Sequence, residues 1–284
     1  MSKYEVKDYK GKRKPSWCPG CGDFSVLAAL NMAMAKKEYV PEDTTIVSGI
    51  GCSSRFPFFT STYGFHTIHG RALPVSIGLK QARPETNVVV VGGDGDGLSI
   101  GGNHFIHAAR KNPDITYIMM DNEIYALTKG QCSPTSRTGT VTKCNPYDWT
   151  ADRINPVLLA LSFNASFVAR GYSGDIKQLE QLIYMGLNHK GFSFIHVMSP
   201  CVQYNKVSSF EKIKELIRPI PESHDPKNRL DAMNFAFSEE GLFTGVFYNI
   251  DKPTYEERYQ HVIETAQAGL PKDFSVKDVI KQFV

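Results

Sequence analysis

The sequence has almost no excess of charge of either sign, and it contains no long hydrophobic run. Its 32 lysines and arginines and 29 aspartates and glutamates leave a net charge of +3. Proteins that bind nucleic acid usually concentrate far more positive charge on one face, so we expect no nucleic-acid partner. The apolar runs have the length of β-strands, whereas a membrane-spanning helix needs about 20 apolar residues. We therefore expect no membrane association.

A signal peptide is also missing, because the first residues, Met1 to Lys7, are charged. We therefore expect a cytoplasmic protein. In that reducing compartment the six cysteines are expected to be thiols or metal ligands rather than disulfides. Residues 1–15 are rich in lysine and arginine and are interpreted as a basic N-terminal tail.

A third absence lies in the glycine-rich segment Gly92–Gly102. Dinucleotide-binding turns have the pattern Gly-x-Gly-x-x-Gly, but here Gly95-x-Gly97 is followed by Ile100 at the third position. A nicotinamide site is therefore disfavoured. The segment still reads as a strand, a turn and a helix start, an arrangement that binds phosphates through backbone N–H groups.

Two carboxylates in this turn, Asp94 and Asp96, would repel a pyrophosphate unless a cation lay between them and the ligand. Asn122 stands at the end of the next predicted strand, so its amide is expected beside Asp94 at the same edge of the sheet. Magnesium prefers oxygen ligands and takes some of them from substrate phosphates. The pattern predicts a magnesium-assisted phosphate site.

Apolar runs of strand length alternate with helical patterns along the chain. This alternation predicts an α/β protein with a mostly parallel, doubly wound sheet, which binds ligands at the carboxyl ends of its strands. Asp23 and Asp175 stand where helix N-caps belong. Prolines cluster after Arg218, so we interpret residues 16–218 as the main domain and residues 219–284 as a C-terminal extension. The expected strands are 44–48, 87–91, 115–120, 165–169 and 192–197, and the expected helices are 24–37, 72–82, 101–111, 155–162 and 176–188.

Four of the six cysteines, Cys18, Cys21, Cys52 and Cys201, lie at predicted strand ends or helix starts. The first two form a Cys-Pro-Gly-Cys turn, which holds two thiolates on one side. Such a turn is shared by zinc sites, redox dithiols and iron–sulfur sites. Together the four indicate a metal site.

Several motifs, read in order, resemble the β subunits of 2-oxoacid:ferredoxin oxidoreductases, and the likeness spans about residues 14 to 210. The fold implied is the thiamine diphosphate-binding fold, as its pyrophosphate-type domain. The motifs are Cys18-Pro19-Gly20-Cys21-Gly22, Gly49–Ser53, His69–Ala72, Gly93–Asp96, Asn122–Gln131 and Ser199-Pro200-Cys201.

The resemblance implies a set of ligands for each of three cofactors. Cys18, Cys21, Cys52 and Cys201 would bind one [4Fe–4S] cluster, and no further ferredoxin-type cysteine run occurs. The side chains of Asp94 and Asn122 and the carbonyl of Ile124 would bind Mg²⁺. Thiamine diphosphate itself would contact Ile50, Gly51, Cys52, Ser53, His69, Gly95, Asp96, Ala126 and Leu127.

The implied reaction is the coenzyme A-dependent oxidative decarboxylation of a 2-oxoacid, with electrons passing from the thiamine-bound intermediate through the cluster to ferredoxin. It is reversible as a reductive carboxylation. The amino-acid sequence of Cys18–Phe24 and Ser53–Phe56 is most similar to that of 2-oxoglutarate-specific members, and pyruvate is the alternative substrate. A zinc-stabilised binding protein without redox activity is the alternative from another class.

The resemblance also implies a partner. The glutamate that activates thiamine diphosphate belongs to a pyrimidine-binding domain, which we expect on an α subunit in an αβ or (αβ)₂ assembly. Arg55 and Lys129 are candidates for contacting the substrate carboxylate or a coenzyme A phosphate. The basic residues between Lys7 and Lys14 form either a solvated tail or a docking patch for acidic ferredoxin.

Overall fold

The computed structural model describes residues 3–269, 275, 277, 280 and 281, and this part of the chain forms one eight-stranded sheet. Its spatial order is β2-β1-β3-β4-β6-β5-β8-β7, and among these neighbouring pairs only β5 and β8 are antiparallel. The strands are β1 (Thr44–Ser48), β2 (Tyr63–His66), β3 (Asn87–Gly93), β4 (Thr116–Asp121), β5 (Phe167–Tyr172), β6 (Ser193–Met198), β7 (Ile217–Pro219) and β8 (Leu242–Asn249).

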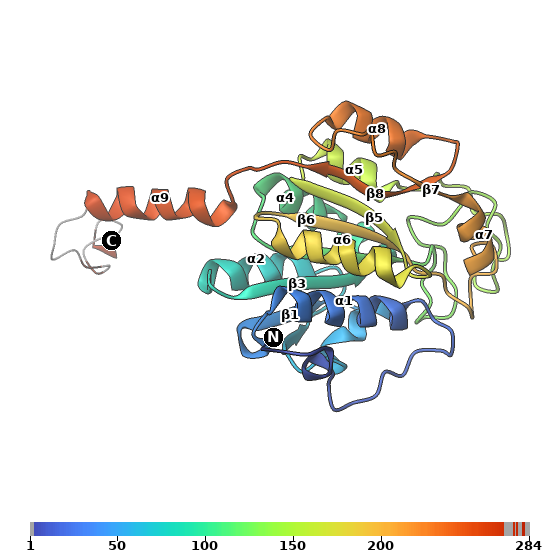
Figure 1. The fold of residues 1–284 in the computed structure, drawn as a ribbon, viewed down its shortest axis with the longest axis horizontal. Coiled ribbons are helices and arrows are strands. Elements are labelled where there is room, and N and C mark those ends of the chain that lie inside the picture. The colour runs from blue at the N-terminus through green and yellow to red at the C-terminus, as the bar shows by residue number, and fades with distance from the viewer. Residues whose placement is uncertain (1–2, 270–274, 276, 278–279, 282–284) are drawn as a thin grey trace.

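Helices cover both faces of the sheet, with α1 and α6 on one side and α2, α4, α5 and α8 on the other (Figure 1). None of the helices among the described residues is both long enough and apolar enough to cross a membrane. The helices are α1 (Asp23–Lys37), α2 (Ala72–Ala82), α3 (Asp94–Leu98), α4 (Gly102–Lys111), α5 (Pro156–Ser162), α6 (Ile176–Asn188), α7 (Phe210–Leu216), α8 (Arg229–Phe237) and α9 (Tyr255–Ala268).

Two hydrophobic cores result from the alternation of side chains along the central strands. In β3, Val89 and Val91 pack towards α1 and α6, whereas Val88 and Val90 pack towards the helices of the opposite face. All four are buried, as expected for a parallel sheet covered on both sides. The doubly wound α/β fold expected from the sequence is confirmed.

All five expected strands are present, with ends displaced by a few residues, and the helices 72–82 and 176–188 have the expected bounds. Asp175 caps α6 as predicted, because its side chain accepts a hydrogen bond from the Gln178 N–H at 3.1 Å. The predicted cap at Asp23 is wrong. Gly22 is the N-cap of α1, and the Asp23 carboxylate instead accepts from the Ser199 hydroxyl at 2.9 Å.

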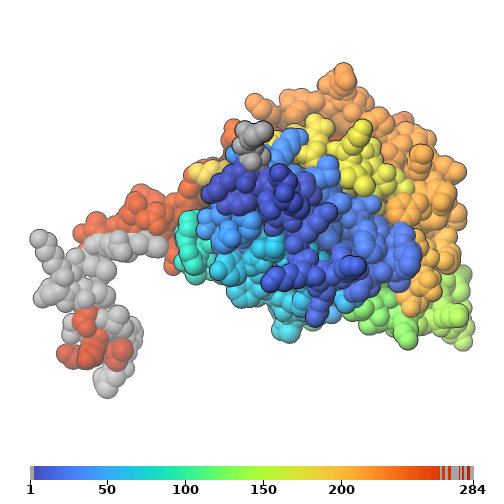
Figure 2. Space-filling view, turned by 60° about the horizontal axis from the view of Figure 1, so that its bottom comes forward, coloured from blue at the N-terminus to red at the C-terminus, as the bar shows by residue number. Residues whose placement is uncertain are grey.

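The two ends of the chain contribute to the sheet domain. Near the N-terminus, Tyr9 is fully buried and Lys10 bridges to Thr60, so the basic segment is anchored although its charged side chains stay exposed. Figure 2 shows this segment in dark blue, lying on the body of the molecule. At the other end β8 enters the main sheet, while α9 projects away from it (Figures 1 and 2). Part of the expected N-terminal tail, residues 1–2, and part of the expected C-terminal extension, residues 270–274, 276, 278–279 and 282–284, lie outside the described residues.

Candidate functional site

Two neighbouring cavities open where β1, β3, β4 and β6 end, each with a volume of about 180 Å³. Four residues line both of them: Cys52, Asn122, Ala126 and Leu127. We call them the cysteine cavity, which includes all four predicted cluster ligands, and the acidic cavity. The acidic cavity is lined by every residue predicted to bind Mg²⁺ or thiamine diphosphate, from Ile50 to Ser53, His69, Asp94 to Asp96, Asn122, Ile124, Ala126 and Leu127.

Asp94 begins the short helix α3 directly after β3 and is only 1% exposed. Its carboxylate accepts a hydrogen bond from the Thr135 hydroxyl at 2.7 Å, and the same hydroxyl lies 2.8 Å from Asp121. Burial, and then the negative charge of Asp121, raise the pKa of Asp94. A carboxylate held in this setting is stabilised by a bound cation.

Asn122, Glu123 and Ile124 form the loop after β4. The Asn122 side-chain oxygen accepts from the Ile124 N–H at 3.1 Å, and Glu123 adopts a left-handed backbone conformation, with φ of 57°. The loop brings a side-chain amide and a backbone carbonyl to the cavity that Asp94 also lines. These are all oxygen donors of the kind that Mg²⁺ takes, so the residues present fit this ion.

Asp96 connects two loops of the acidic cavity. One of its oxygens lies 2.9 Å from the Ile50 N–H, 2.8 Å from the Gly70 N–H and 2.7 Å from His69 Nδ1. A Cβ at Gly49 would come within 1.9 Å of this carboxylate, so the close approach requires glycine there. Asp96 therefore positions Ile50 and His69, in addition to lining the cavity itself.

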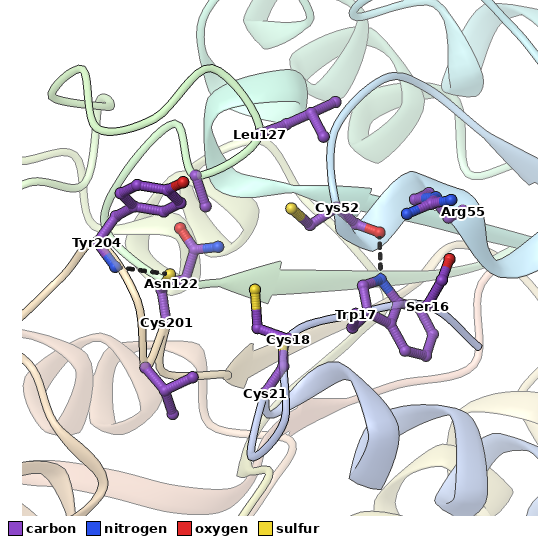
Figure 3. Close-up of a pocket in the computed structure, with 12 residues that line it drawn as sticks. Ser16, Trp17, Cys18, Cys21, Cys52, Arg55, Asn122, Leu127, Cys201 and Tyr204 are labelled. Atoms are coloured by element: carbon purple, nitrogen blue, oxygen red, sulfur yellow. Dashed lines mark hydrogen bonds between the residues drawn. The ribbon is translucent and has the colours of Figure 1, made fainter.

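The cysteine cavity brings together four cysteines from three segments, the predicted cluster ligands (Figure 3). Cys18 and Cys21 lie on one turn, with the Cys21 N–H bonded to the Cys18 carbonyl at 3.0 Å. The Trp17 indole N–H donates to the Cys52 carbonyl at 2.7 Å, which joins this turn to the loop after β1. The Tyr204 N–H donates to the Cys201 sulfur at 3.4 Å.

Burial raises the pKa of the Cys52 thiol to about 11, and burial together with the Asp23 carboxylate raises that of Cys21 still further. Such thiols keep their protons at neutral pH, so a metal must displace protons to bind. Four thiols from three segments, facing one cavity, fit a metal cluster by the chemistry of the donor set.

Of the two residues predicted to contact a substrate carboxylate or a coenzyme A phosphate, Arg55 and Lys129, only the first lines one of the two cavities. Arg55 lines the cysteine cavity, whereas Lys129 lines neither cavity and has a positive φ of 77°. Sequence reasoning missed two residues that hold these loops, Thr135 and Trp17. The aromatic residue directly before a Cys-x-x-Cys turn was a visible signal for Trp17, but nothing in the sequence pairs Thr135 with Asp94.

Comparison with known proteins agrees with this geometry. Residues 49–197 match the family model of the C-terminal thiamine pyrophosphate-binding domain of thiamine pyrophosphate enzymes, and residues 201–264 match that of the C-terminal part of the pyruvate ferredoxin oxidoreductase beta subunit. The fold and the acidic cavity thus define a thiamine diphosphate-binding enzyme domain.

Relatives identify the family. The beta subunit of 2-oxoacid:ferredoxin oxidoreductase 1 from Aeropyrum pernix is 41% identical, over 91% of this chain and 85% of its own length. A 2-oxoglutarate synthase subunit, KorB, from Methanocaldococcus jannaschii is 37% identical, over 87% of this chain and 92% of its own. The chain belongs to the β subunits of the 2-oxoacid:ferredoxin oxidoreductases, as the sequence motifs predicted. Membership as a β subunit implies an α partner.

A solved structure has the same fold over nearly the whole chain. It is described as the 2-oxoglutarate:ferredoxin oxidoreductase from Magnetococcus marinus with 2-oxoglutarate, coenzyme A and succinyl-CoA bound. The similarity has a TM-score of 0.94 at 40% identity, and covers 99% of this chain and 97% of the other.

Proposed function

We propose that this β subunit, with its α partner, catalyses the coenzyme A-dependent oxidative decarboxylation of 2-oxoglutarate to succinyl-CoA and CO₂, and reduces ferredoxin. The same reaction in reverse is a reductive carboxylation. The ligands named for the Magnetococcus marinus enzyme and the 2-oxoglutarate synthase relative support this substrate. Pyruvate is the second candidate, since the family model for residues 201–264 is that of a pyruvate enzyme.

In the acidic cavity, Asp94, Asn122 and the Ile124 carbonyl would hold Mg²⁺ against the pyrophosphate of thiamine diphosphate. His69 and the backbone groups of the loops at Ile50–Ser53 and Gly95 would line the cofactor, with Asp96 fixing the positions of Ile50 and His69. When bound, thiamine diphosphate supplies the electron sink that allows a 2-oxoacid to lose CO₂. The chain's own part is to bind the cofactor, orient it and keep it buried.

In the cysteine cavity, Cys18, Cys21, Cys52 and Cys201 would hold one [4Fe–4S] cluster. A zinc site, the alternative from the sequence, needs four sulfurs at about 2.3 Å from one ion. Among the described residues, no three His, Cys, Asp or Glu side chains are grouped closely enough to hold a single ion. A [4Fe–4S] cluster is larger than a single ion and takes one thiolate for each iron, and four thiols line this cavity.

One observation carries the proposal, namely the wall that the two cavities share. Cys52 lines both, so its thiol side faces the cluster ligands while its loop continues into the cofactor cavity. An electron donor bound in one cavity and an acceptor bound in the other would be separated by a few side chains. Cys18, on the exposed rim of the cysteine cavity, gives electrons an exit towards ferredoxin.

The test is to purify the chain anaerobically together with its α subunit and to assay ferredoxin reduction with a panel of 2-oxoacids plus coenzyme A. We expect 2-oxoglutarate to give the highest kcat/KM. A higher value for pyruvate would reject the proposed substrate but keep the reaction class. Product formation without any electron acceptor would reject the redox reaction itself.

A further inference from the structure

A third cavity lies apart from the two described above, between α5, α8 and the start of β8, and its volume is about 720 Å³. The Asn155 side chain donates to the Ala236 carbonyl at 2.8 Å and so connects α5 with α8 at this place. Figure 1 shows these two helices side by side. Part of the lining is apolar, from Leu158, Leu159 and Phe163. The volume is in the range of small-molecule sites, at roughly 300–1,000 Å³.

Two arginines line this cavity, Arg153 and Arg170. Arg170 is only 2% exposed, yet its guanidinium donates to three uncharged acceptors. They are His196 Nδ1 at 3.1 Å, the Phe243 carbonyl at 3.3 Å and the Asn155 side-chain oxygen at 3.4 Å. Within the described chain, the carboxylate that compensates this charge, Asp121, is reached only through His196. The guanidinium also lies over the Phe247 ring, 5.3 Å from its centroid. A buried charge whose adjacent partners are all uncharged is costly, so the cavity favours an anion.

The position of the second arginine, Arg153, also favours an anion in this cavity. Arg153 has a side chain 37% exposed and lies 3.9 Å from the Glu123 carboxylate. Burial, and then the positive charge of Arg153, lower the pKa of Arg170 to about 10. An anion between the two guanidiniums would relieve that repulsion. Glu239, on the rim, is the acidic group of the lining and would oppose an anion there.

We propose that this cavity binds a small organic anion bearing a phosphate group or two carboxylates, held between Arg153 and Arg170. The leucines and Phe163 would contact its apolar part. The site does not depend on the proposed substrate. It lies close to the loop that carries the proposed magnesium ligand Asn122. Arg170 is connected through His196 to Asp121, and Arg153 lies near Glu123, the two residues on either side of Asn122.

The test uses the αβ complex saturated with thiamine diphosphate and Mg²⁺, so that the pyrophosphate site is filled. Inorganic phosphate and malonate are titrated separately by calorimetry at constant ionic strength, with chloride as the reference ion. Saturable binding of either anion is expected, and the tighter of the two shows whether the natural ligand carries phosphate or carboxylates.

Three variants test the location. Arg153→Gln should weaken anion binding about tenfold, the effect of losing one charge-assisted contact. Arg137→Gln is the matched control, because Arg137 also contacts Glu123, at 3.2 Å, but does not line the cavity, so the affinity should not change. Glu239→Gln should tighten binding. The proposal is overturned if neither anion binds the complex saturably, or if Arg153→Gln binds as tightly as Arg137→Gln.

Discussion

Thr135 links the two buried carboxylates beside the acidic cavity. Its hydroxyl has a single proton and stands between two buried carboxylates, those of Asp94 and Asp121. Asp121 also accepts a hydrogen bond from the buried His196 at 2.8 Å and from the Glu123 N–H at 2.9 Å, so its charge is well compensated. Of the two carboxylates, Asp94 has the less well compensated negative charge, and it lines the acidic cavity. A magnesium ion bound there, as proposed above, would compensate that charge.

Replacing Thr135 by valine tests this account. The variant keeps the shape but removes the hydroxyl. The two neighbouring carboxylates then lose the group that bridges them, and Asp94 would be held less accurately towards the proposed magnesium ion. We expect the Kd of thiamine diphosphate at fixed Mg²⁺ to rise about tenfold, as for the loss of a hydrogen bond to a charged group. Calorimetric titration of the apo complex measures it.

Thr135→Ser is the control, because serine keeps the hydroxyl and should restore most of the affinity. The iron content of Thr135→Val should equal that of the unmodified protein. Equal cofactor affinity in the valine and serine variants would show that the hydroxyl has no positioning role.

A second prediction at this scale concerns pH and His189. Burial lowers the pKa of His189 from its ordinary value of 6.5, against weaker opposing effects of the Asn249 side chain, Asp114 and Asp251. Below pH 6.5 the unfolded chain therefore binds more protons at this residue than the folded chain does. Stability from the neutral imidazole is present above that pH and is lost as the pH falls.

The measurement is the thermal midpoint of the complex at about pH 7.5 and about pH 5.5, on either side of the usual histidine range. We expect the midpoint to fall towards acid, and to fall less in His189→Gln. His196, whose pKa burial also lowers, accounts for part of the remaining slope. An acid-induced drop of the same size in the variant would contradict the assignment to His189.

At the scale of elements, the site is built from strand ends and from the contacts between the loops that follow them. Cys52 follows β1, Asp94 follows β3 and Cys201 follows β6. The register of the parallel strands aligns these ends at one edge of the sheet. Trp17 then joins the Cys18 turn to the loop of Cys52.

Trp17→Phe should therefore weaken the proposed cluster site more than the fold. Phenylalanine can keep the ring packing against Phe59, whose centroid is 4.8 Å away, but it cannot donate to the Cys52 carbonyl. We expect iron to be lost several-fold faster to a chelator, in line with about 1 kcal/mol for one hydrogen bond. Absorbance near the cluster band during chelation follows the loss.

The second tryptophan of the chain provides the matched control. The indole N–H of Trp149 is buried and has no hydrogen-bond partner among the described residues. Trp149→Phe should thus leave the rate of iron loss unchanged. If the two variants lose iron at the same rate, the Trp17 hydrogen bond does not stabilise the cysteine loops.

The elements also show what sequence reasoning can and cannot reach. The strands that carry the site are buried on both faces, so continuous apolar runs such as Val88–Val91 were sufficient to predict them. β2 is exposed along its length and β8 pairs with β5 across a long separation in sequence, so neither has such a local signal. Asp23 stands where a helix cap is expected, but its carboxylate bonds to Ser199, a residue distant in sequence, and the local sequence does not reveal this tertiary contact.

At the scale of the whole molecule, the exposed charges of the N-terminal segment are either a solvated tail or a docking patch for ferredoxin, and the second interpretation can be tested. Lys12, Arg13 and Lys14 are exposed and lead into Cys18. Replacing these three by glutamine should raise the KM for ferredoxin at low salt, because long-range attraction speeds the encounter. The difference from the unmodified complex should shrink at high salt.

The control is a viologen dye as electron acceptor, for which the triple variant should have unchanged turnover. An unchanged KM for ferredoxin at low salt would show that these charges do not guide docking.

The central claim is that a cluster in the cysteine cavity accepts electrons generated in the acidic cavity. The most direct measurement is electron paramagnetic resonance of the anaerobic αβ complex, frozen after adding 2-oxoglutarate and coenzyme A without ferredoxin. The account predicts the signal of a reduced [4Fe–4S] cluster, which disappears in Asp94→Ala although that variant keeps its iron. A colourless complex with zinc and no iron, or an iron signal that substrate leaves unchanged, would contradict it.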